Sequence, residues 1–217
     1  MSTRFDIGAA SARLRPGRPL VIVDADEVLL RFVDGFDRFL RSNGLYLDLS
    51  SYRLHGNVKR VEDDTPVLDV EVTALLDAFR GELDSLATVD GAADALSSLT
   101  ARADIVVLTN IAETQAPARL RNLADHGLHF PVVANSGPKG PAVRALTSRA
   151  ATSFFVDDIP QHLASVAEAA PDVFRIHLIG DERLKPLLPP AAHAHLRAGD
   201  WAEAGTFIHA RLDEAGH

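Results

Sequence analysis

The chain of 217 residues contains no cysteine and only one methionine and one tryptophan. The absence of cysteine excludes disulfide bonds, thiolate metal sites and a cysteine nucleophile. Basic residues are also in the minority, with 22 against 30 acidic ones, and the formal net charge is −8. Such a surface repels a phosphate backbone as a whole, so we expect no nucleic-acid partner.

Long hydrophobic runs are missing as well. No apolar stretch reaches the roughly 18 residues that a membrane helix needs. The opening MSTRFDIGAASARLRPGRP has no apolar centre of the kind that marks a secretory signal. We therefore expect a cytoplasmic protein with no membrane partner. Hydrophobic residues still make up 47% of the chain, which is enough for one well-cored domain with a small insert.

Five short apolar runs, rich in β-branched residues, predict the strands of a sheet. They cover 20–23, 105–108, 154–156 and 174–179, with a weaker candidate at 131–133. Largely continuous apolar runs fit strands that are covered on both faces, as in a parallel sheet. Segments with helical spacing lie between and after them, at 91–101, 117–123, 141–146, 162–170 and 201–212, the last anchored by Trp201. This alternation predicts a doubly wound, Rossmann-like α/β fold.

Residues 31–90 interrupt the alternation. They contain two amphipathic stretches, whose apolar stripes comprise Phe32, Phe36, Phe39 and Leu40 in the first and Val70, Leu75, Leu76 and Phe79 in the second. The segment LHGNVKRVEDDTP between them is polar and turn-prone. We predict a small, mainly helical cap over 31–90, inserted after the first strand, and an α/β core formed by 1–30 and 91–217. A pair of ordinary crossover helices with a long loop is the alternative.

The segment PPAAHAHL contains His193 and His195, which suggest a zinc site at first sight. The segment is flanked by proline and has no neighbouring acidic general base. We therefore expect a surface helix there.

Carboxylates follow two of the predicted strands. Asp24 and Asp26 come after 20–23, and Asp157 and Asp158 come after 154–156. Because the carboxyl ends of parallel strands meet at one edge of a sheet, we expect all four side chains to converge. Two close carboxylates do not ionise independently, so one suits a nucleophile and the other a general acid. Four of them together favour a hard cation such as Mg²⁺, which binds oxygen ligands and substrate phosphate.

Three more residues complete the candidate site. Thr109 and Asn110 follow the run at 105–108, and Lys139 lies in the turn SGPKGP before a predicted helix. A lysine there would neutralise a phosphate oxygen or the nucleophilic carboxylate. The turn is not a Walker A loop, since it lacks the glycine spacing and the hydroxyl after lysine. A response-regulator receiver uses similar residues, but no second acidic pair follows its lysine.

The four motifs, in this order, resemble those of the haloacid dehalogenase superfamily. DADEV is similar to the first motif, VVLTN to the second, Lys139 in GPKG to the third and FFVDDIP to the fourth, over about 19–179. The insert stands where such enzymes carry a helical cap. Two departures occur: Val28 replaces a common threonine, and Asp157-Asp158 replaces the common Gly-Asp form, a pairing that also occurs in the family.

The resemblance implies a role for each residue of the site. Asp24 would be the nucleophile that forms an aspartyl-phosphate, and Asp26 would protonate the leaving oxygen and then activate water. Thr109 and Lys139 would bind the transferring phosphoryl group, with Asn110 as a further substrate contact. These roles satisfy phosphoryl transfer, which depends mainly on positioning and charge neutralisation.

The resemblance also implies the metal and the reaction. Mg²⁺ would be bound by Asp24, the backbone carbonyl of Asp26 and Asp158, with Asp157 as a ligand or a supporting partner. A carboxylate at position 26 is typical of the phosphatases and phosphomutases rather than of the dehalogenases. We predict a magnesium-dependent phosphomonoester hydrolase whose substrate is a small phosphorylated metabolite. A phosphomutase, or a catalytically weak binding or regulatory protein on the same scaffold, is the alternative.

Overall fold

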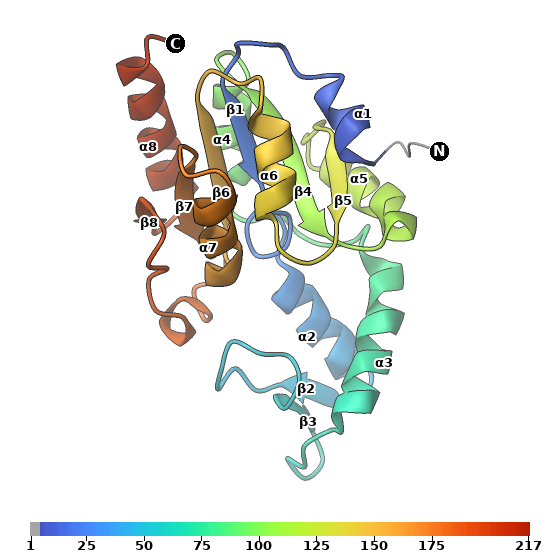
Figure 1. The fold of residues 1–217 in the computed structure, drawn as a ribbon. Coiled ribbons are helices and arrows are strands. Elements are labelled where there is room, and N and C mark those ends of the chain that lie inside the picture. The colour runs from blue at the N-terminus through green and yellow to red at the C-terminus, as the bar shows by residue number, and fades with distance from the viewer. Residues whose placement is uncertain (1–4) are drawn as a thin grey trace.

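The computed structural model describes residues 5–217, and its main feature is a six-stranded sheet (Figure 1). The strand order is β5-β4-β1-β6-β7-β8, and all neighbours are parallel. The strands are β1 (Leu20–Val23), β4 (Asp104–Asn110), β5 (Val132–Asn135), β6 (Ser153–Asp157), β7 (Phe174–Leu178) and β8 (Leu196–Ala198). All five predicted strands are present, and the predicted α/β fold class is confirmed.

Helices cover both faces of this sheet. One face carries α4 (Ala92–Leu99), α5 (Ala116–Asp125) and α8 (Trp201–Glu214), and the other carries α1 (Ile7–Ser11), α6 (Gly140–Thr147) and α7 (Pro160–Ala169). In β1, Val21 and Val23 belong to the apolar cluster of the first face, whereas Leu20 and Ile22 belong to that of the second. Both directions of the pleat are therefore buried, which explains a strand that is apolar at every position.

The carboxyl-terminal part differs from the prediction in one segment and agrees with it in another. His193 and His195 do not lie on a surface helix, because β8 begins directly after them and pairs with β7. The ring of His195 packs edge-on against Phe174, with 5.5 Å between the centroids. A three-residue strand is too short to show a recognisable period. Trp201 is buried and its Nε1 donates a hydrogen bond to the carbonyl of Val28 at 2.8 Å, so the predicted anchor of α8 is confirmed.

Residues 31–90, called here the cap segment, lie below the large sheet in Figure 1. They form α2 (Phe32–Ser42), β2 (Leu45–Leu47), β3 (Val58–Arg60) and α3 (Asp69–Phe79). The polar segment predicted as turns contains β3, which pairs antiparallel with β2. Val70, predicted on the apolar stripe, is 73% exposed, and Val72 is buried instead. Short 3₁₀ helices occur at η1 (Arg80–Glu82), η2 (Glu113–Gln115) and η3 (Lys185–Leu187).

Aromatic packing joins α2 to α3. The ring centroid of Phe79 lies 5.3 Å from those of Phe32 and Phe36 and 5.5 Å from that of Phe39. The buried apolar residues of the cap segment belong to the same cluster as those on one face of the large sheet. Because one apolar cluster runs through both parts, the division into a core of 1–30 and 91–217 and a cap of 31–90 stays a prediction. No helix within residues 5–217 is long and apolar enough to cross a membrane.

Candidate active site

The register of the sheet brings the predicted acidic residues to one edge. Val23 of β1 pairs with Val156 of β6, and the amide of Asp24 donates a hydrogen bond to the carbonyl of Val156 at 2.9 Å. The next residue along β6 is Asp157, so the ladder sets these two aspartates side by side. β4 and β5 lie on one side of β1, and β6, β7 and β8 lie on the other, so the strand order reverses next to β1. Ligands bind at such switch points of parallel α/β sheets.

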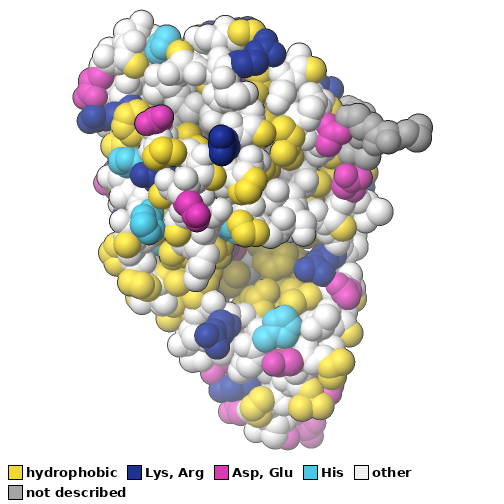
Figure 2. Space-filling view, viewed as in Figure 1, with side chains coloured by type: hydrophobic (Ala, Val, Ile, Leu, Met, Phe, Trp, Pro, Cys, Tyr) yellow, Lys and Arg dark blue, Asp and Glu magenta, His cyan; other side chains and the backbone are white. Residues whose placement is uncertain are grey.

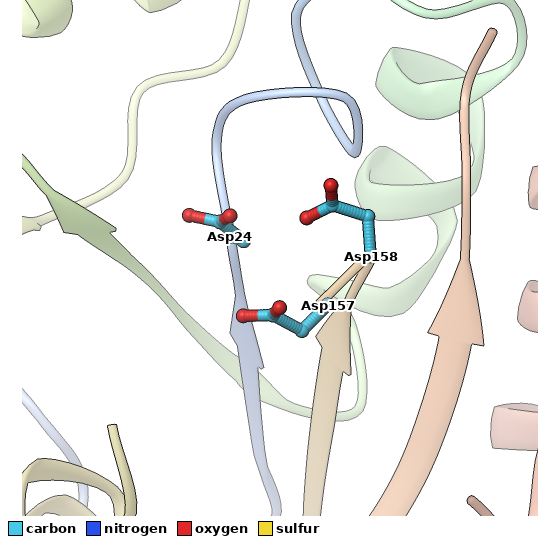
Figure 3. Close-up of side chains that lie close together, drawn as sticks. All are labelled: Asp24, Asp157 and Asp158. Carbon is cyan, nitrogen blue, oxygen red and sulfur yellow. The ribbon is translucent and has the colours of Figure 1, made fainter. Parts of the chain in front are cut away.

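Asp24, Asp157 and Asp158 converge at this edge (Figure 3). Each offers a carboxylate oxygen, and the three oxygens lie within 4.8 Å of one another. All three residues are buried, and burial raises the pKa of Asp157 and Asp158; the carboxylate of Asp157 raises that of Asp158 further. Buried carboxylates are costly without a compensating cation. The donor set, all oxygen and all acidic, fits a hard divalent ion such as Mg²⁺.

Lys139 already neutralises part of this charge. Its side chain is buried, and Nζ lies 2.7 Å from Asp24 Oδ1 and 2.7 Å from Asp157 Oδ2. The contact with Asp157 is a hydrogen bond, whereas the contact with Asp24 is an ion pair without hydrogen-bond alignment. Burial by itself would lower the pKa of Lys139, but the two carboxylates outweigh it and raise that pKa. Lys139 therefore remains charged at neutral pH.

Close packing of α6 on α7 holds Lys139 in place. α6 begins at Gly140, and a Cβ on that residue would lie 2.2 Å from the carbonyl oxygen of Ser165. Only glycine therefore permits this approach, and its amide donates a hydrogen bond to Ser165 Oγ at 3.1 Å. Pro141 suits the first turn of the helix. The start of α6, and with it the backbone of Lys139, is fixed against α7.

Thr109 and Asn110 occupy the end of β4 in different ways. Thr109 is buried, and its Oγ1 has no hydrogen-bond partner within residues 5–217. A buried hydroxyl without a partner is costly, and a ligand oxygen would satisfy it. Asn110 is exposed; it accepts a hydrogen bond from Asn135 Nδ2 at 2.7 Å and donates one to the carbonyl of Gly137 at 3.0 Å. It therefore braces the loop before Lys139, and its role as a substrate contact stays a prediction.

The side chain of Asp26 does not join the three clustered carboxylates. Its Oδ1 lies 2.5 Å from Nη2 of Arg119 on α5. Burial raises the pKa of Asp26, and the charge of Arg119 opposes that rise. Arg119 is fully buried, and its Nε and Nη1 have no partners in the described part of the chain. Arg119 is not recognisable as a site residue from the sequence, because an arginine in an amphipathic helix carries no sign of burial.

Two more residues, neither of them recognisable from the sequence, hold Asp158. The hydroxyl of Tyr52, in the cap segment, donates a hydrogen bond to Asp158 Oδ2. His177 of β7 is fully buried and accepts a hydrogen bond from the amide of Ala191 at its Nδ1. The proton of the neutral ring therefore lies on Nε2, which donates to the carbonyl of Asp158 at 2.9 Å. Tyr52 thus positions the side chain of Asp158 and His177 its backbone.

Glu27 follows Asp26 and has an unusual backbone. Its φ is 58°, in the left-handed region that favours glycine. Its amide donates to the carbonyl of Leu30 at 2.8 Å, and its carbonyl accepts from the amide of Gly180 at 2.6 Å. Glu27 Oε1 accepts a hydrogen bond from the amide of Val33 at 2.7 Å. Burial raises the pKa of Glu27 to about 8.

A cavity of about 310 Å³ lies beside these residues. Asp26, Glu27 and Asp158 form part of its wall, and the cap segment supplies most of the rest. Figure 2 shows a hollow with hydrophobic side chains between the α/β part and the cap segment on the face viewed. A substrate group larger than phosphate therefore has space next to Asp26.

The fold can be compared with known proteins. No protein-family model matches the sequence, and a search of curated proteins finds no match. Solved structures do match in three dimensions. A conserved haloacid dehalogenase-like protein of unknown function from Agrobacterium tumefaciens has a TM-score of 0.63 at 18% identity, over 90% of this chain and 99% of that one. The chain has the haloacid dehalogenase-like fold. The resemblance predicted from the four motifs is confirmed at this level.

Two other haloacid dehalogenase-like structures differ in the chemistry that they represent. One is a haloacid dehalogenase family hydrolase from Deinococcus radiodurans with bound phosphate and sodium. It has a TM-score of 0.58 at 19% identity, over 93% of this chain and 98% of that one. The other is a defluorinating L-2-haloacid dehalogenase, with a TM-score of 0.58 at 12% identity over 90% and 100%. Because both share the fold, the fold does not determine the reaction, which depends on the residues of the site.

Proposed function

We propose that this haloacid dehalogenase-like protein is a magnesium-dependent hydrolase of phosphomonoesters and that its substrate is a small phosphorylated metabolite. The observation that supports this best is Lys139 between Asp24 and Asp157, at the edge where the buried hydroxyl of Thr109 has no partner within the described residues. A charged donor and a free hydroxyl suit the oxygens of a phosphoryl group. A phosphoryl group with Mg²⁺ would also compensate the buried acidic charge.

The metal would be bound by Asp24, Asp158 and the backbone carbonyl of Asp26. Asp157 suits a supporting position, because both of its oxygens already have protein partners, Lys139 Nζ and the amide of Ile159. When bound, Mg²⁺ would neutralise charge on the phosphoryl oxygens and on the carboxylates around it.

The reaction would proceed in two steps, formation of an aspartyl-phosphate and its hydrolysis. A carboxylate oxygen of Asp24 attacks phosphorus, the ester P–O bond breaks, and Asp26 gives its proton to the leaving oxygen. Asp26, now ionised, then takes a proton from the water that attacks the aspartyl-phosphate. Lys139 and Thr109 hold the phosphoryl oxygens in both steps. Burial helps Asp26 to carry the first proton, and the pairing with Arg119 favours the ionised form that the second step needs.

Asp26 is the reason to favour phosphate esters over haloacids. A halide leaves without a proton, whereas an alkoxide needs an acid beside it. In this chain a carboxyl group of raised pKa borders both the acidic cluster and the cavity. The phosphomutase alternative uses the same first step and differs only in the group that accepts the phosphoryl group.

The test is a phosphate-release screen over phosphorylated metabolites with and without Mg²⁺. We expect metal-dependent release, and Asp24→Asn should reduce it at least about 1,000-fold. Asp125→Asn, which changes an exposed aspartate of α5, is the matched control. The enzyme proposal fails if no ester yields phosphate in the presence of metal. Full turnover by Asp24→Asn would reject the nucleophile, and isomerised substrate without phosphate release would indicate a mutase.

A further inference from the structure

Arg119 of α5 is buried more completely than its contacts explain. Its side chain is fully buried, yet within residues 5–217 only Nη2 has a hydrogen-bond partner, and that partner is Asp26 Oδ1 at 2.5 Å. A buried ion pair that leaves other donors unsatisfied stabilises a fold less than apolar side chains of similar volume. The packing of α5 therefore does not explain this arginine, and its effect on Asp26 is the remaining explanation.

Asp26 is held by one of its two carboxylate oxygens. Oδ1 pairs with Arg119, whereas Oδ2 has no hydrogen-bond partner within the described part of the chain. The side chain of Asp26 is 29% exposed, and the residue shares the wall of the cavity with Asp158. Because Arg119 lies entirely in the interior, the exposed part of the carboxyl group borders the cavity.

The proposed metal ligands lie directly beside the side chain of Asp26. Its own backbone carbonyl is one of them, and Asp24, two residues earlier, supplies another. The carboxylate of Asp26 is therefore about one side-chain length from the metal, and rotation about its side-chain bonds can bring it there. Mg²⁺ usually takes one or two carboxylates and keeps its other positions for water and substrate phosphate. A further carboxylate would occupy one of those positions and repel the phosphoryl group.

Arg119 stands on a part of α5 that is itself fixed. Asn122, three residues along the same face, is buried, and its Nδ2 donates a hydrogen bond to the carbonyl of Leu86 at 2.9 Å. His126, directly after the helix, donates from Nε2 to the same carbonyl at 2.8 Å. This face of α5 is therefore bound to the end of the cap segment, which gives the guanidinium group a rigid support.

Building on the proposed function, we propose that Arg119 is a positioning residue that acts on the reaction through Asp26. It holds Asp26 by Oδ1 outside the ligand set of the metal and leaves Oδ2 at the cavity, where the ester oxygen departs. A metal position then stays open for a phosphoryl oxygen, and the acid stands beside the leaving group. Lys139 cannot take this part, because its Nζ is shared between Asp24 and Asp157.

Crystal structures of the Mg²⁺ complex, without substrate, test the position of Asp26 directly. In wild type we expect the metal at the acidic cluster and the side chain of Asp26 still paired with Arg119. In Arg119→Met we expect Asp26 to turn and coordinate the metal in place of a water molecule. The inference is overturned if the carboxylate of Asp26 coordinates Mg²⁺ in wild type, or if it stays off the metal in the variant.

Two esters of similar shape show whether Arg119 acts on the departure of the leaving group. 4-Nitrophenyl phosphate releases an anion that is stable without a proton, whereas 4-nitrobenzyl phosphate releases an alkoxide that needs an acid. In Arg119→Met, kcat/KM for the benzyl ester should fall about 100-fold further than for the phenyl ester. Equal losses for the two esters would indicate a merely structural role and would overturn the inference.

Arg119→Lys replaces this variant if Arg119→Met does not fold. Lysine keeps the charge but has one amine in place of the planar fork, so the ratio of the two kcat/KM values should fall about tenfold. An unchanged ratio in Arg119→Lys would then overturn the inference.

A double variant shows whether the effect passes through Asp26. Asp26→Asn removes the acid, so adding Arg119→Met to it should change the ester ratio by less than about twofold. Additive losses would mean that Arg119 acts independently of Asp26, which contradicts the inference. Arg121→Met makes the same substitution at an exposed position of α5, where the pair with Asp84 lies on the surface, and should leave the ratio unchanged.

The metal complexes and the esters separate this inference from the proposed function. The expected structures without hydrolysis of any phosphomonoester support the positioning of Asp26 and reject the hydrolase. Hydrolysis with an ester ratio that Arg119→Met leaves unchanged overturns this inference alone. The absence of both metal at the acidic cluster and hydrolysis rejects both.

Discussion

The two sides of the cavity are built by different means. On the α/β side, Asp24 and Asp157 stand at the ends of neighbouring strands whose register is held by backbone hydrogen bonds. On the cap side, the walls come from α2, β2 and the loop that follows β2, and packing around Phe79 joins α2 to α3. Reacting groups need placement to a fraction of an ångström, which a hydrogen-bonded ladder supplies. Cavity walls need only shape and polarity, which side-chain packing supplies with more freedom.

The two sides also differ in buried charge. The sheet edge concentrates three carboxylates and one lysine, whereas the cap segment contributes chiefly apolar side chains and the hydroxyl of Tyr52. Changes at the sheet edge should therefore affect charge balance and chemistry together. Changes in the cap segment should affect packing and substrate choice.

The largest effect is expected at the sheet edge, from Lys139→Met. The variant leaves the buried carboxylates of Asp24 and Asp157 without their cation, which should cost about 3–5 kcal/mol in the free energy of unfolding of the metal-free protein. Turnover should fall by about 1,000-fold, as for other losses of charge stabilisation in a buried site. Urea unfolding measures the free energy of unfolding, and phosphate release measures turnover. Lys59→Met, in the cap segment, should change both little; an equal loss there would contradict the difference between the two sides.

Phe79→Ala tests whether the cap segment is separate from the α/β part. Removing this buried ring should cost about 3–5 kcal/mol. Since one apolar cluster joins the two parts, we expect a single unfolding transition, with the fluorescence of Trp201 and the far-UV circular dichroism changing together. Phe155→Ala, on the opposite face of the sheet, is the control and should also unfold in one step. A separate early transition in Phe79→Ala that leaves Trp201 unaffected would show an independent cap.

Glu27 should make the stability of the metal-free protein depend on pH. Burial raises the pKa of Glu27 from its ordinary 4.5 to about 8, so in this window the folded state retains a proton that the unfolded state releases. Stability is therefore lost as the pH rises from 4.5 to 8, by at most about 5 kcal/mol at about 1.4 kcal/mol per pKa unit. Glu27→Gln should match wild type at pH 4.5 and exceed it at pH 8. Urea unfolding with a chelator measures this, and a difference that is constant with pH would refute it.

The smallest effect is expected where the cap segment touches the acidic cluster. Tyr52→Phe removes the hydroxyl that donates to Asp158 and should cost about 1 kcal/mol in stability. Burial and the charge of Asp158 both raise the pKa of Tyr52, so this hydroxyl is a neutral donor throughout the working pH range. Tyr46→Phe is the matched control, since Tyr46 donates to the exposed Asp64 within the cap segment. Thermal unfolding should separate the two variants, and equal melting temperatures would argue against the Tyr52 contact.

Much of the fold could be predicted because its signals are local. Strands buried on both faces are continuous apolar runs, and the five main ones were identified within one or two residues of their ends. β2, β3 and β8 were missed, because three residues cannot establish a period. Val70 was predicted on the buried face of α3, but Val72 is buried instead. The apolar residues of this helix fit more than one face, and the sequence does not show which face packs inward.

The order of the acidic pairs, the threonine and the lysine, and their positions after particular strands, can be read directly from the amino-acid chain. A parallel sheet then brings Asp24, Asp157 and Lys139 together with no further information, because strand ends meet at one edge. The residues that surround this group come from distant parts of the chain. Arg119 reaches Asp26 across 93 residues of chain, and Tyr52 reaches Asp158 across 106. Contacts of that range depend on how helices and cap pack on the sheet, and no periodicity or composition of a single segment encodes them.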